Sequence, residues 1–391
     1  MKILLVTREF PPTVVGGIGR LSFYTYKYLR TLGVDVKVVA FGNDSDSSDD
    51  VFFFKPSSSI TMRRDDPLFG TLRIPLDIAK FTCFVNKLAE IEKYDIVHVL
   101  EPYVGGFIKH EHKVTTIHDT AYREFKAWSK YPLSQSFKRL VFYLSIGYIM
   151  EIANIYTSQA VIAPSIGTAA TLRTVYRVPV TKIRVVPNGI EPPNKILDQR
   201  LAKKMLGLDS DIVLIFTTAH HVARKRLETL IEALKNLKNW SVQGYKVVIG
   251  GEGPLTDYYK ALTHKYGLDK FIKFTGWLHD DELHAYYSAC DIFVITSESE
   301  AGPITLLEAA IRGKAIITTD IDGLPAFMKH GLHCLKFGVG DSKTLAQHLK
   351  KLISNKELRI KLGLNANKIA KQFTWDRVIK RVVKIYKEVL Y

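Results

Sequence analysis

The stretch IFVITSESEAGPITLLEAAIRGKAIITT, residues 292–319, decides the fold. An apolar run at 292–297 predicts a buried strand, and a second run at 315–319 predicts another. Pro303 suits the first position of the helix that carries LLEAAI between them. A strand, a helix and a second strand in this order predict a parallel βαβ unit.

The same alternation of short β-rich runs and longer helical patterns fills the chain of 391 residues. It predicts a strand at 2–7, 34–41, 96–99, 113–117, 160–163 and 183–186 in the first half, and at 212–218, 246–249, 272–275, 292–297 and 315–319 in the second. Repeated βαβ units of this kind indicate an α/β fold with two doubly wound domains.

The segment PNGIEPPN at 187–194 breaks every periodic pattern with prolines, asparagines and a glycine, and it is interpreted as a hinge. The expected domains are therefore 1–190 and 191–375. A last helix at about 376–391 follows a break at FTWD and has no strand partner, so we expect it to cross back to the first domain.

Composition limits the class of protein. The opening MKILLVTREF has too short an apolar run for a signal peptide, and no window reaches the length of a transmembrane helix, so a cytoplasmic protein is expected. Cys83, Cys290 and Cys334 are odd in number and far apart. This spacing indicates neither a disulfide framework nor a zinc site.

The net charge of +16 is concentrated in two places. Residues 343–391 carry 13 Lys or Arg against three acids, and residues 123–150 mix five basic residues with aromatic ones. Such runs are either solvated helix faces or surfaces for an anionic membrane, nucleic acid or phosphorylated ligands. No nucleic-acid recognition motif accompanies them, so no nucleic-acid partner is expected.

Ligands of doubly wound sheets bind beyond the carboxyl ends of strands, so the segments after the predicted strands are the candidate sites. After the first strand, REFPPTVVGGIGR brings Gly16 and Gly17 before a helix expected near Arg20. It is either a simple turn or a turn that offers N–H groups to phosphate. After 113–117 comes His118, which either hydrogen-bonds a sugar hydroxyl or shuttles a proton, or is a core histidine bonded to backbone.

The second half offers similar positions. After 212–218, TTAHHVARKR places Lys225 where it either reaches a diphosphate or is solvated, and His220 could assist it. After 246–249, IGGEGPL contains Gly251 in a turn that lets a base or ribose lie against backbone. After 272–275, TGW is followed by Leu278. Each signal alone is weak, and their order along the chain carries more information.

Glu300 and Glu308 are the last candidate site residues. Glu300 falls in the loop after a strand and Glu308 in the helix that follows, with the free N–H groups of Ile304 and Thr305 between them. Those N–H groups and the helix dipole favour an anion. Ionised carboxylates accept hydrogen bonds from hydroxyls, so the arrangement suits sugar, diphosphate and ribose in turn.

Taken together, these residues resemble the retaining glycosyltransferases of the GT4 family. The resemblance covers nearly the whole chain and rests on GGIGR, TIHD at His118, PNGI, GEGP, TGW, the E-x7-E of Glu300 and Glu308 with EAAIRGKAII, DGLP and FTW. It implies the GT-B fold, in which two Rossmann-like domains face each other across a cleft.

The resemblance also implies the reaction and the roles. The second domain would hold a nucleotide-diphospho-sugar and the first an acceptor, with retention of anomeric configuration, without cofactor or divalent metal. His118, Lys225 and Glu300 would act at the reacting sugar and leaving diphosphate. It also implies that Gly16, Gly17, Ile304 and Thr305 bind the diphosphate and that Glu308 binds the ribose. His220, Gly251 and Leu278 are further candidate binding residues, because each follows a predicted strand.

Three departures from the family pattern stand out. The usual Gly-Arg is Ala219-His220, so the arginine partner of Lys225 is missing, and His220, Arg224 or Arg226 would have to substitute. Gly-Phe-Gly after the first glutamate is Ala301-Gly302-Pro303, and the glutamate after GLP is Ala326. The first departure bears on diphosphate departure and the others on donor preference.

The expected activity is hexose transfer to a lipid-linked saccharide by a protein that is cytoplasmic or peripheral on the inner face of the membrane. The basic and aromatic residues of 127–150 suit an anionic surface. Transfer to a soluble sugar or polysaccharide is the alternative, followed by a nucleotide-sugar 2-epimerase and a non-catalytic nucleotide-sugar-binding protein. The DxD at 44–46 lies in a serine and aspartate run and is interpreted as a chance match.

Overall fold

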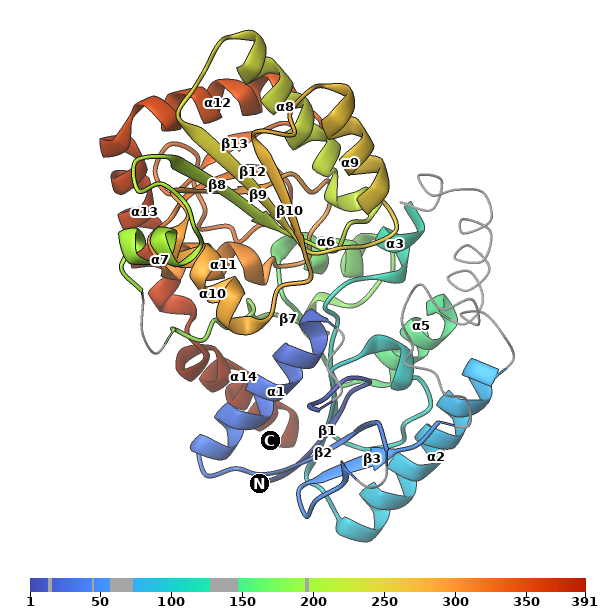
Figure 1. Cartoon of the computed structure of the whole chain (residues 1–391). Helices are drawn as coiled ribbons and strands as arrows, with labels where there is room; N and C mark the ends of the chain where they lie inside the picture. The colour runs from blue at the N-terminus through green and yellow to red at the C-terminus, as the bar shows by residue number, and fades with distance from the viewer. Residues whose placement is uncertain (13–15, 44–45, 57–72, 127–146, 194–196) are drawn as a thin grey trace. The chain divides into compact units, whose positions relative to one another are not determined.

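The structure is a computed structural model that describes residues 1–391 except 13–15, 44–45, 57–72, 127–146 and 194–196. The described residues divide into two compact units. Unit 1 is Met1–Gly189 with Trp375–Tyr391, and unit 2 is Ile190–Thr374. Each unit holds a parallel sheet flanked by helices (Figure 1), so the α/β, doubly wound fold predicted from the sequence is confirmed.

The sheet of unit 1 has seven strands in the order β3-β2-β1-β4-β5-β6-β7, all parallel. The chain leaves β1 toward one side of the sheet and returns to β4 on the other, which makes a switch point at the carboxyl ends of these two strands. The strands are β1 (Lys2–Val6), β2 (Asp35–Phe41), β3 (Val51–Phe54), β4 (Ile96–Val99), β5 (Lys113–Thr116), β6 (Ala160–Ala163) and β7 (Ile183–Val185).

The sheet of unit 2 has six parallel strands in the order β10-β9-β8-β11-β12-β13, with the switch point between β8 and β11. Residues 292–319 form β11, the helix α11 (Ile304–Ile311) and β12 there. The strands are β8 (Val213–Thr218), β9 (Tyr245–Gly250), β10 (Ile272–Gly276), β11 (Ile292–Ile295), β12 (Ala315–Thr319) and β13 (Leu335–Phe337).

Helices connect these strands in both units. Among the described residues of unit 1, the α-helices are α1 (Gly17–Thr31), α2 (Arg73–Glu92), α3 (Ala121–Lys126), α5 (Tyr148–Thr157), α6 (Ile166–Thr174) and α14 (Trp375–Leu390). Those of unit 2 are α7 (Gln199–Met205), α8 (Leu227–Asn239), α9 (Thr256–Lys265), α10 (Asp280–Ala289), α11 (Ile304–Ile311), α12 (Ser342–Ser354) and α13 (Lys356–Ala370).

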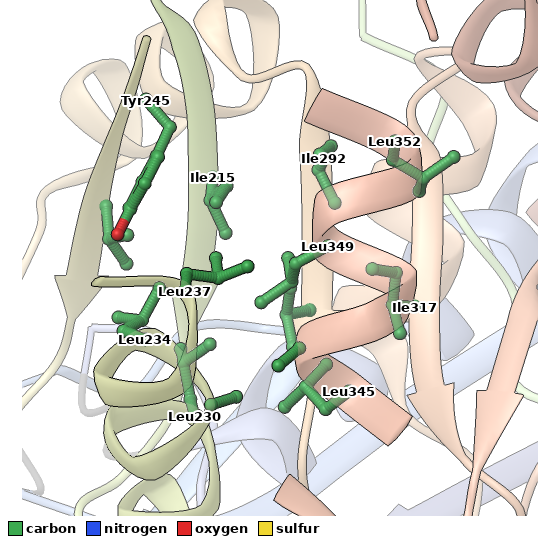
Figure 2. Close-up of a cluster of buried hydrophobic side chains, with 14 of the residues drawn as sticks. Ile215, Leu230, Leu234, Leu237, Tyr245, Ile292, Ile317, Leu345, Leu349 and Leu352 are labelled. Carbon is green, nitrogen blue, oxygen red and sulfur yellow. The ribbon is translucent and has the colours of Figure 1, made fainter. Parts of the chain in front are cut away.

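The core of unit 2 shows how the sequence periodicity becomes packing. Helix α8 has leucines three or four residues apart, Leu230, Leu234 and Leu237, and each is fully buried against the sheet (Figure 2). Helix α12 packs on the same face. Figure 2 shows both helices against the alternate strand residues Ile215, Ile292 and Ile317, which point to that face. This packing makes a rigid frame for the loops at the strand ends.

Helix α14 belongs to unit 1 although it follows unit 2 in the chain. The Trp375 indole stacks on the rings of Tyr24 and Tyr28 of α1, with centroid separations of 5.9 and 6.3 Å. A Cβ at Gly189 would lie 2.4 Å from the indole, so only glycine fits beside it. Farther along α14, the Tyr386 hydroxyl lies 2.6 Å from Nδ1 of His98 in β4.

Some element boundaries differ from the prediction. The edge strands β3 and β13 were not predicted. Helix α1 begins at Gly17, three residues before the expected start near Arg20. Pro303 is the N-cap residue of α11 and Ile304 its first residue, so the expected first helical position of Pro303 is wrong by one.

Cys290 and Cys334 are buried and Cys83 is exposed, and all three are free thiols.

Candidate active site

A small polar pocket lies at the switch point of unit 2, where β8 and β11 end beside each other. Three residues predicted from the sequence, Lys225, Glu300 and Thr305, line it together. Hydroxyl side chains supply most of the remaining wall. The other lining residues are Thr217, Thr218, Ala219, Leu227, Ile295, Thr296 and Ser297.

The centre of this pocket is the ion pair of Lys225 and Glu300. Lys225 Nζ donates to Glu300 Oε1 at 2.5 Å, and the Ser297 hydroxyl donates to the same oxygen at 2.6 Å. Glu300 is only 7% exposed. Burial raises the pKa of its carboxyl, but Lys225, Arg224 and the two hydrogen bonds outweigh burial, so the pKa lies below its ordinary value. Glu300 is therefore ionised at neutral pH.

Arg224 is the second cation beside Glu300, with Nη1 3.7 Å from Oε2. The sequence left three substitutes for the missing arginine open, and the structure separates them by their contacts. Arg226 pairs with Glu228 and Glu298. His220 is exposed. Arg224 shares Glu300 with Lys225, a contact that the sequence alone does not reveal.

Two hydrogen bonds hold the segment of Lys225 against the loop of Glu300. The Thr296 hydroxyl donates to the carbonyl of Lys225 at 2.7 Å, and the N–H of Glu298 donates to the carbonyl of Arg224 at 2.9 Å. On the far side, the DGLP turn packs so closely that a Cβ at Gly323 would lie 1.4 Å from the Glu300 carbonyl oxygen. Backbone packing thus fixes Glu300 from two sides.

Glu308 lies away from this pocket, one turn into α11. Its Oε2 accepts a hydrogen bond of 2.7 Å from the Tyr287 hydroxyl of α10. Burial, followed by Glu308 itself, raises the pKa of Tyr287 well above its ordinary value, so the phenol stays a donor. Ile304 and Thr305 open α11 and have no N–H partner within the helix. Tyr287 is a contact of Glu308 that the sequence analysis missed.

Gly251 and Leu278 meet other parts of the protein. The N–H of Gly251 donates to the Gly276 carbonyl at 2.7 Å, so this amide of the predicted ligand turn is used within the fold. Leu278 is nearly buried and packs with the apolar cluster that includes Phe216 and Tyr286. Trp277 beside it is 60% exposed.

In unit 1, the glycine turn after β1 leads directly into α1. Gly16 is the N-cap residue and Gly17 the first residue of the helix. The N–H of Gly16, predicted to face a phosphate, donates to Glu9 Oε2 at 2.9 Å. Arg8 Nη2 lies 3.1 Å from the other oxygen of this carboxylate. The Glu9 carboxylate therefore accepts the hydrogen bond that the Gly16 N–H was predicted to donate to a phosphate.

His118 follows β5, as predicted. Both ring nitrogens are hidden from solvent and have no hydrogen-bond partner among the described residues. Burial lowers the pKa of the ring to about 4, so the imidazole is neutral at pH 7. The core-histidine interpretation required backbone partners, which the described part of the chain does not supply.

The segment after His118 is anchored by a residue that sequence reasoning missed. The N–H of Ala121, where α3 begins, donates to Glu151 Oε2 at 2.9 Å, and the Tyr176 hydroxyl donates to the same oxygen. Glu151 is completely buried, and burial raises the pKa of its carboxyl to about 8. A buried acid on α5 thus holds the loop that carries His118.

Several expectations meet the limits of the described residues. The aromatic and basic stretch at 127–146 lies outside them, as do Asp44 and Ser45 of the DxD. Within the described ranges, no group of three or more His, Cys, Asp or Glu could hold a metal ion. No helix there is long and apolar enough to cross a membrane.

Comparisons with known proteins agree with this architecture. Residues 198–369 match the family model "Glycosyl transferases group 1", and residues 15–193 match "Glycosyltransferase Family 4". An uncharacterised glycosyltransferase of Methanocaldococcus jannaschii is 25% identical over 99% of this chain and 98% of its own length.

Two further similar proteins carry more specific names. One is the GDP-mannose-dependent alpha-(1-6)-phosphatidylinositol monomannoside mannosyltransferase of Mycobacterium tuberculosis, 24% identical over 52% of this chain and 55% of its own length. The other is the crystal structure of Anabaena HepE in complex with UDP-glucose, which has a TM-score of 0.75, 18% identity, and 99% and 100% coverage of the two chains. At 18% identity, the likeness to HepE shows the fold alone.

Proposed function

Because the chain belongs to the group 1 glycosyltransferases, with the GT-B fold of two Rossmann-like units, we propose that it transfers a hexose from a nucleotide-diphospho-sugar. The acceptor in this proposal is a lipid-linked saccharide at the cytoplasmic face of a membrane. The reaction retains the configuration of the transferred sugar and needs no divalent metal.

The observation that carries the proposal is the ion pair of the partly exposed Lys225 with the buried Glu300, in a pocket lined largely by hydroxyl-bearing residues. An ionised carboxylate accepts hydrogen bonds from adjacent sugar hydroxyls. A lysine beside it neutralises charge that grows on the departing diphosphate, and stabilisation of developing charge is a large contribution to catalysis. The free N–H groups at the start of α11 suit the diphosphate as well.

The names of similar proteins support the choice of donor and acceptor. HepE was crystallised with UDP-glucose, and the mycobacterial relative is named for a GDP-mannose donor and a phosphatidylinositol monomannoside acceptor. UDP-glucose and GDP-mannose are both nucleotide-diphospho-sugars, and phosphatidylinositol monomannoside is a glycolipid. We extend these two classes to this chain.

In the proposed reaction, the acceptor hydroxyl oxygen forms a bond to the anomeric carbon while the bond from that carbon to the diphosphate breaks. Both events occur on one face of the sugar. The acceptor proton passes to a diphosphate oxygen, so no side chain serves as general base. His118 contacts the donor sugar as a neutral imidazole in this scheme, which its lowered pKa allows.

The test is a panel of UDP-, GDP- and ADP-sugars with either glycolipid acceptors in vesicles or soluble saccharides, followed by release of nucleoside diphosphate. We expect turnover with one donor and a glycolipid, an initial product with the donor's anomeric configuration by NMR, and no effect of EDTA. Turnover only with soluble saccharides would refute the lipid acceptor. Donor binding without any release would refute the enzymatic proposal, and formation of a 2-epimer would replace it.

A further inference from the structure

Arg226, the residue after Lys225, has an unusual backbone. Its φ of 48° lies in the left-handed region, which residues with a Cβ rarely adopt. It ends the short turn Ala223–Lys225 and is the N-cap of α8. Glycine would meet this backbone requirement more easily. The contacts of the side chain must therefore explain why an arginine stands at this position.

The Arg226 guanidinium joins two carboxylates. Its Nη1 lies 3.5 Å from Glu298 Oε2, and its Nε lies 3.4 Å from Glu228 Oε1. The side chains of all three are partly shielded from solvent, with exposures of 30, 16 and 23%. The guanidinium also lies against Gly340, where an added Cβ would come within 3.3 Å of Nη2. Arg226 thus connects three loops at the strand ends of unit 2.

Two of these loops carry the central pair of the pocket. Glu298 is two residues before Glu300, and Arg226 directly follows Lys225. The hydrogen bonds from the Glu298 N–H and the Thr296 hydroxyl to the backbone of residues 224 and 225 join the same two segments. The Arg226–Glu298 ion pair adds a charged contact between the same two segments.

We propose that Arg226 is a positioning residue for sugar transfer. By binding Glu298 it keeps Lys225 in place against Glu300, and it neutralises a second carboxylate close to the place where the anionic diphosphate arrives. This proposal rests on the proposed function, in which Lys225 serves the departing diphosphate. Arg226 itself acts through Glu298 and needs no contact with the donor.

The test compares steady-state kinetics of wild type, Arg226→Gly, Glu298→Gln and the double variant. Glycine suits the left-handed backbone, so Arg226→Gly removes the guanidinium while the melting temperature stays within about 2 °C. We expect kcat to fall about tenfold in each single variant, with a change of less than threefold in the donor KM. The double variant should lose no more than either single one, because both remove the same link.

Arg177→Gly is the matched control, since Arg177 is a second arginine with a left-handed backbone (φ 57°) and lies in unit 1. It should keep wild-type kcat. Wild-type kcat in Arg226→Gly would overturn the positioning role. A loss in Arg226→Gly with none in Glu298→Gln would also overturn it, because Arg226 would then act directly. Lys225→Ala, measured alongside, separates the two claims: near wild-type turnover there refutes the role of Lys225 at the departing diphosphate, whereas a wild type without turnover on any donor refutes the proposed function itself.

Discussion

Glu300 depends on Lys225 for its negative charge. Burial alone would favour a neutral Glu300, and the two cations with Ser297 keep it charged. The folded-state pKa of Glu300 is therefore below its unfolded value. Its stabilising contribution is present above an ordinary carboxyl pKa and is lost as the pH falls through the lowered one.

Replacement of Lys225 tests the chemical role of this pair. We expect Lys225→Ala to lower kcat by about 10²- to 10³-fold, because in the proposed reaction this lysine neutralises charge on the departing diphosphate. Lys204→Ala, which removes an exposed lysine of α7, serves as control and should keep wild-type kcat. Release of nucleoside diphosphate under saturating donor is the measurement. A loss of less than threefold in Lys225→Ala would contradict the assigned role.

Glu151 predicts a pH dependence of stability. The pKa of this carboxyl is about 8 in the folded protein, above its ordinary value of 4.5, so the folded state binds the extra proton. Its contribution to stability is complete below about pH 4.5 and is lost as the pH rises to about 8. Glu151→Gln cannot ionise and should lose this dependence.

Between pH 5 and pH 8.5, the melting temperature of wild type should therefore fall more than that of Glu151→Gln, by at least about 2 °C in calorimetry. Glu90→Gln, which changes an exposed carboxylate of α2, is the control and should follow wild type. Parallel pH profiles for wild type and Glu151→Gln would show that Glu151 is ionised in the fold.

At the scale of elements, the buried side chain of Tyr287 links α10 to α11. Tyr287 donates to Glu308, while its ring packs against Phe216 and Phe293. Tyr287→Phe keeps the ring and removes the donor. Loss of one such hydrogen bond should lower the free energy of unfolding by about 1 kcal/mol.

The same variant should raise the donor KM with little change in kcat, if Glu308 binds the ribose and Tyr287 orients it. The conservative control is Tyr286→Phe, on the neighbouring residue that also packs on Phe216. Steady-state kinetics against donor concentration distinguish the two variants. An unchanged donor KM in Tyr287→Phe would argue against orientation of Glu308 by this hydroxyl.

The strands of the sheet centres were predictable because continuous runs of Val, Ile and Leu leave few alternatives. Edge strands were harder. Val51–Phe54 is a four-residue strand after a polar serine and aspartate run, and Leu335–Phe337 has three residues, so neither has enough length for a clear pattern. Both are strands because a neighbour supplies a hydrogen-bonded edge, which is tertiary information.

For the candidate site, the positions of its residues after the strands were also predictable from the sequence. Lys225, Glu300 and Thr305 follow strands that the sequence reveals, and strand ends at a switch point meet by geometry. Side-chain partners were not predictable. Arg224, Lys225 and Arg226 are consecutive, and their different directions come from a tight turn and one left-handed residue. Glu151 is 33 residues after His118 and meets its loop only through folding.

At the scale of the whole molecule, Trp375 makes unit 1 depend on the far end of the described chain. Trp375→Ala should lower the free energy of unfolding by about 3–5 kcal/mol, because a buried indole leaves a cavity between α1 and α14. Hydrogen exchange should show lost protection in α1 and α14 and unchanged protection in β8 and β11. Trp240→Ala, which removes a 37% exposed indole of unit 2, is the control. Equal effects of the two variants would contradict this assignment.

The division of the chain has a consequence for its synthesis. Unit 2 is contiguous, and its two ends lie together, since the N–H of Ile190 donates to the Phe373 carbonyl at 2.9 Å. Unit 1 is split, and α14 leaves the ribosome only after all of unit 2. During translation, the face of α1 with Tyr24 and Tyr28 therefore stays without its contact to Trp375 until all of unit 2 has been synthesised. The half of the enzyme that is translated first is the half that is finished last.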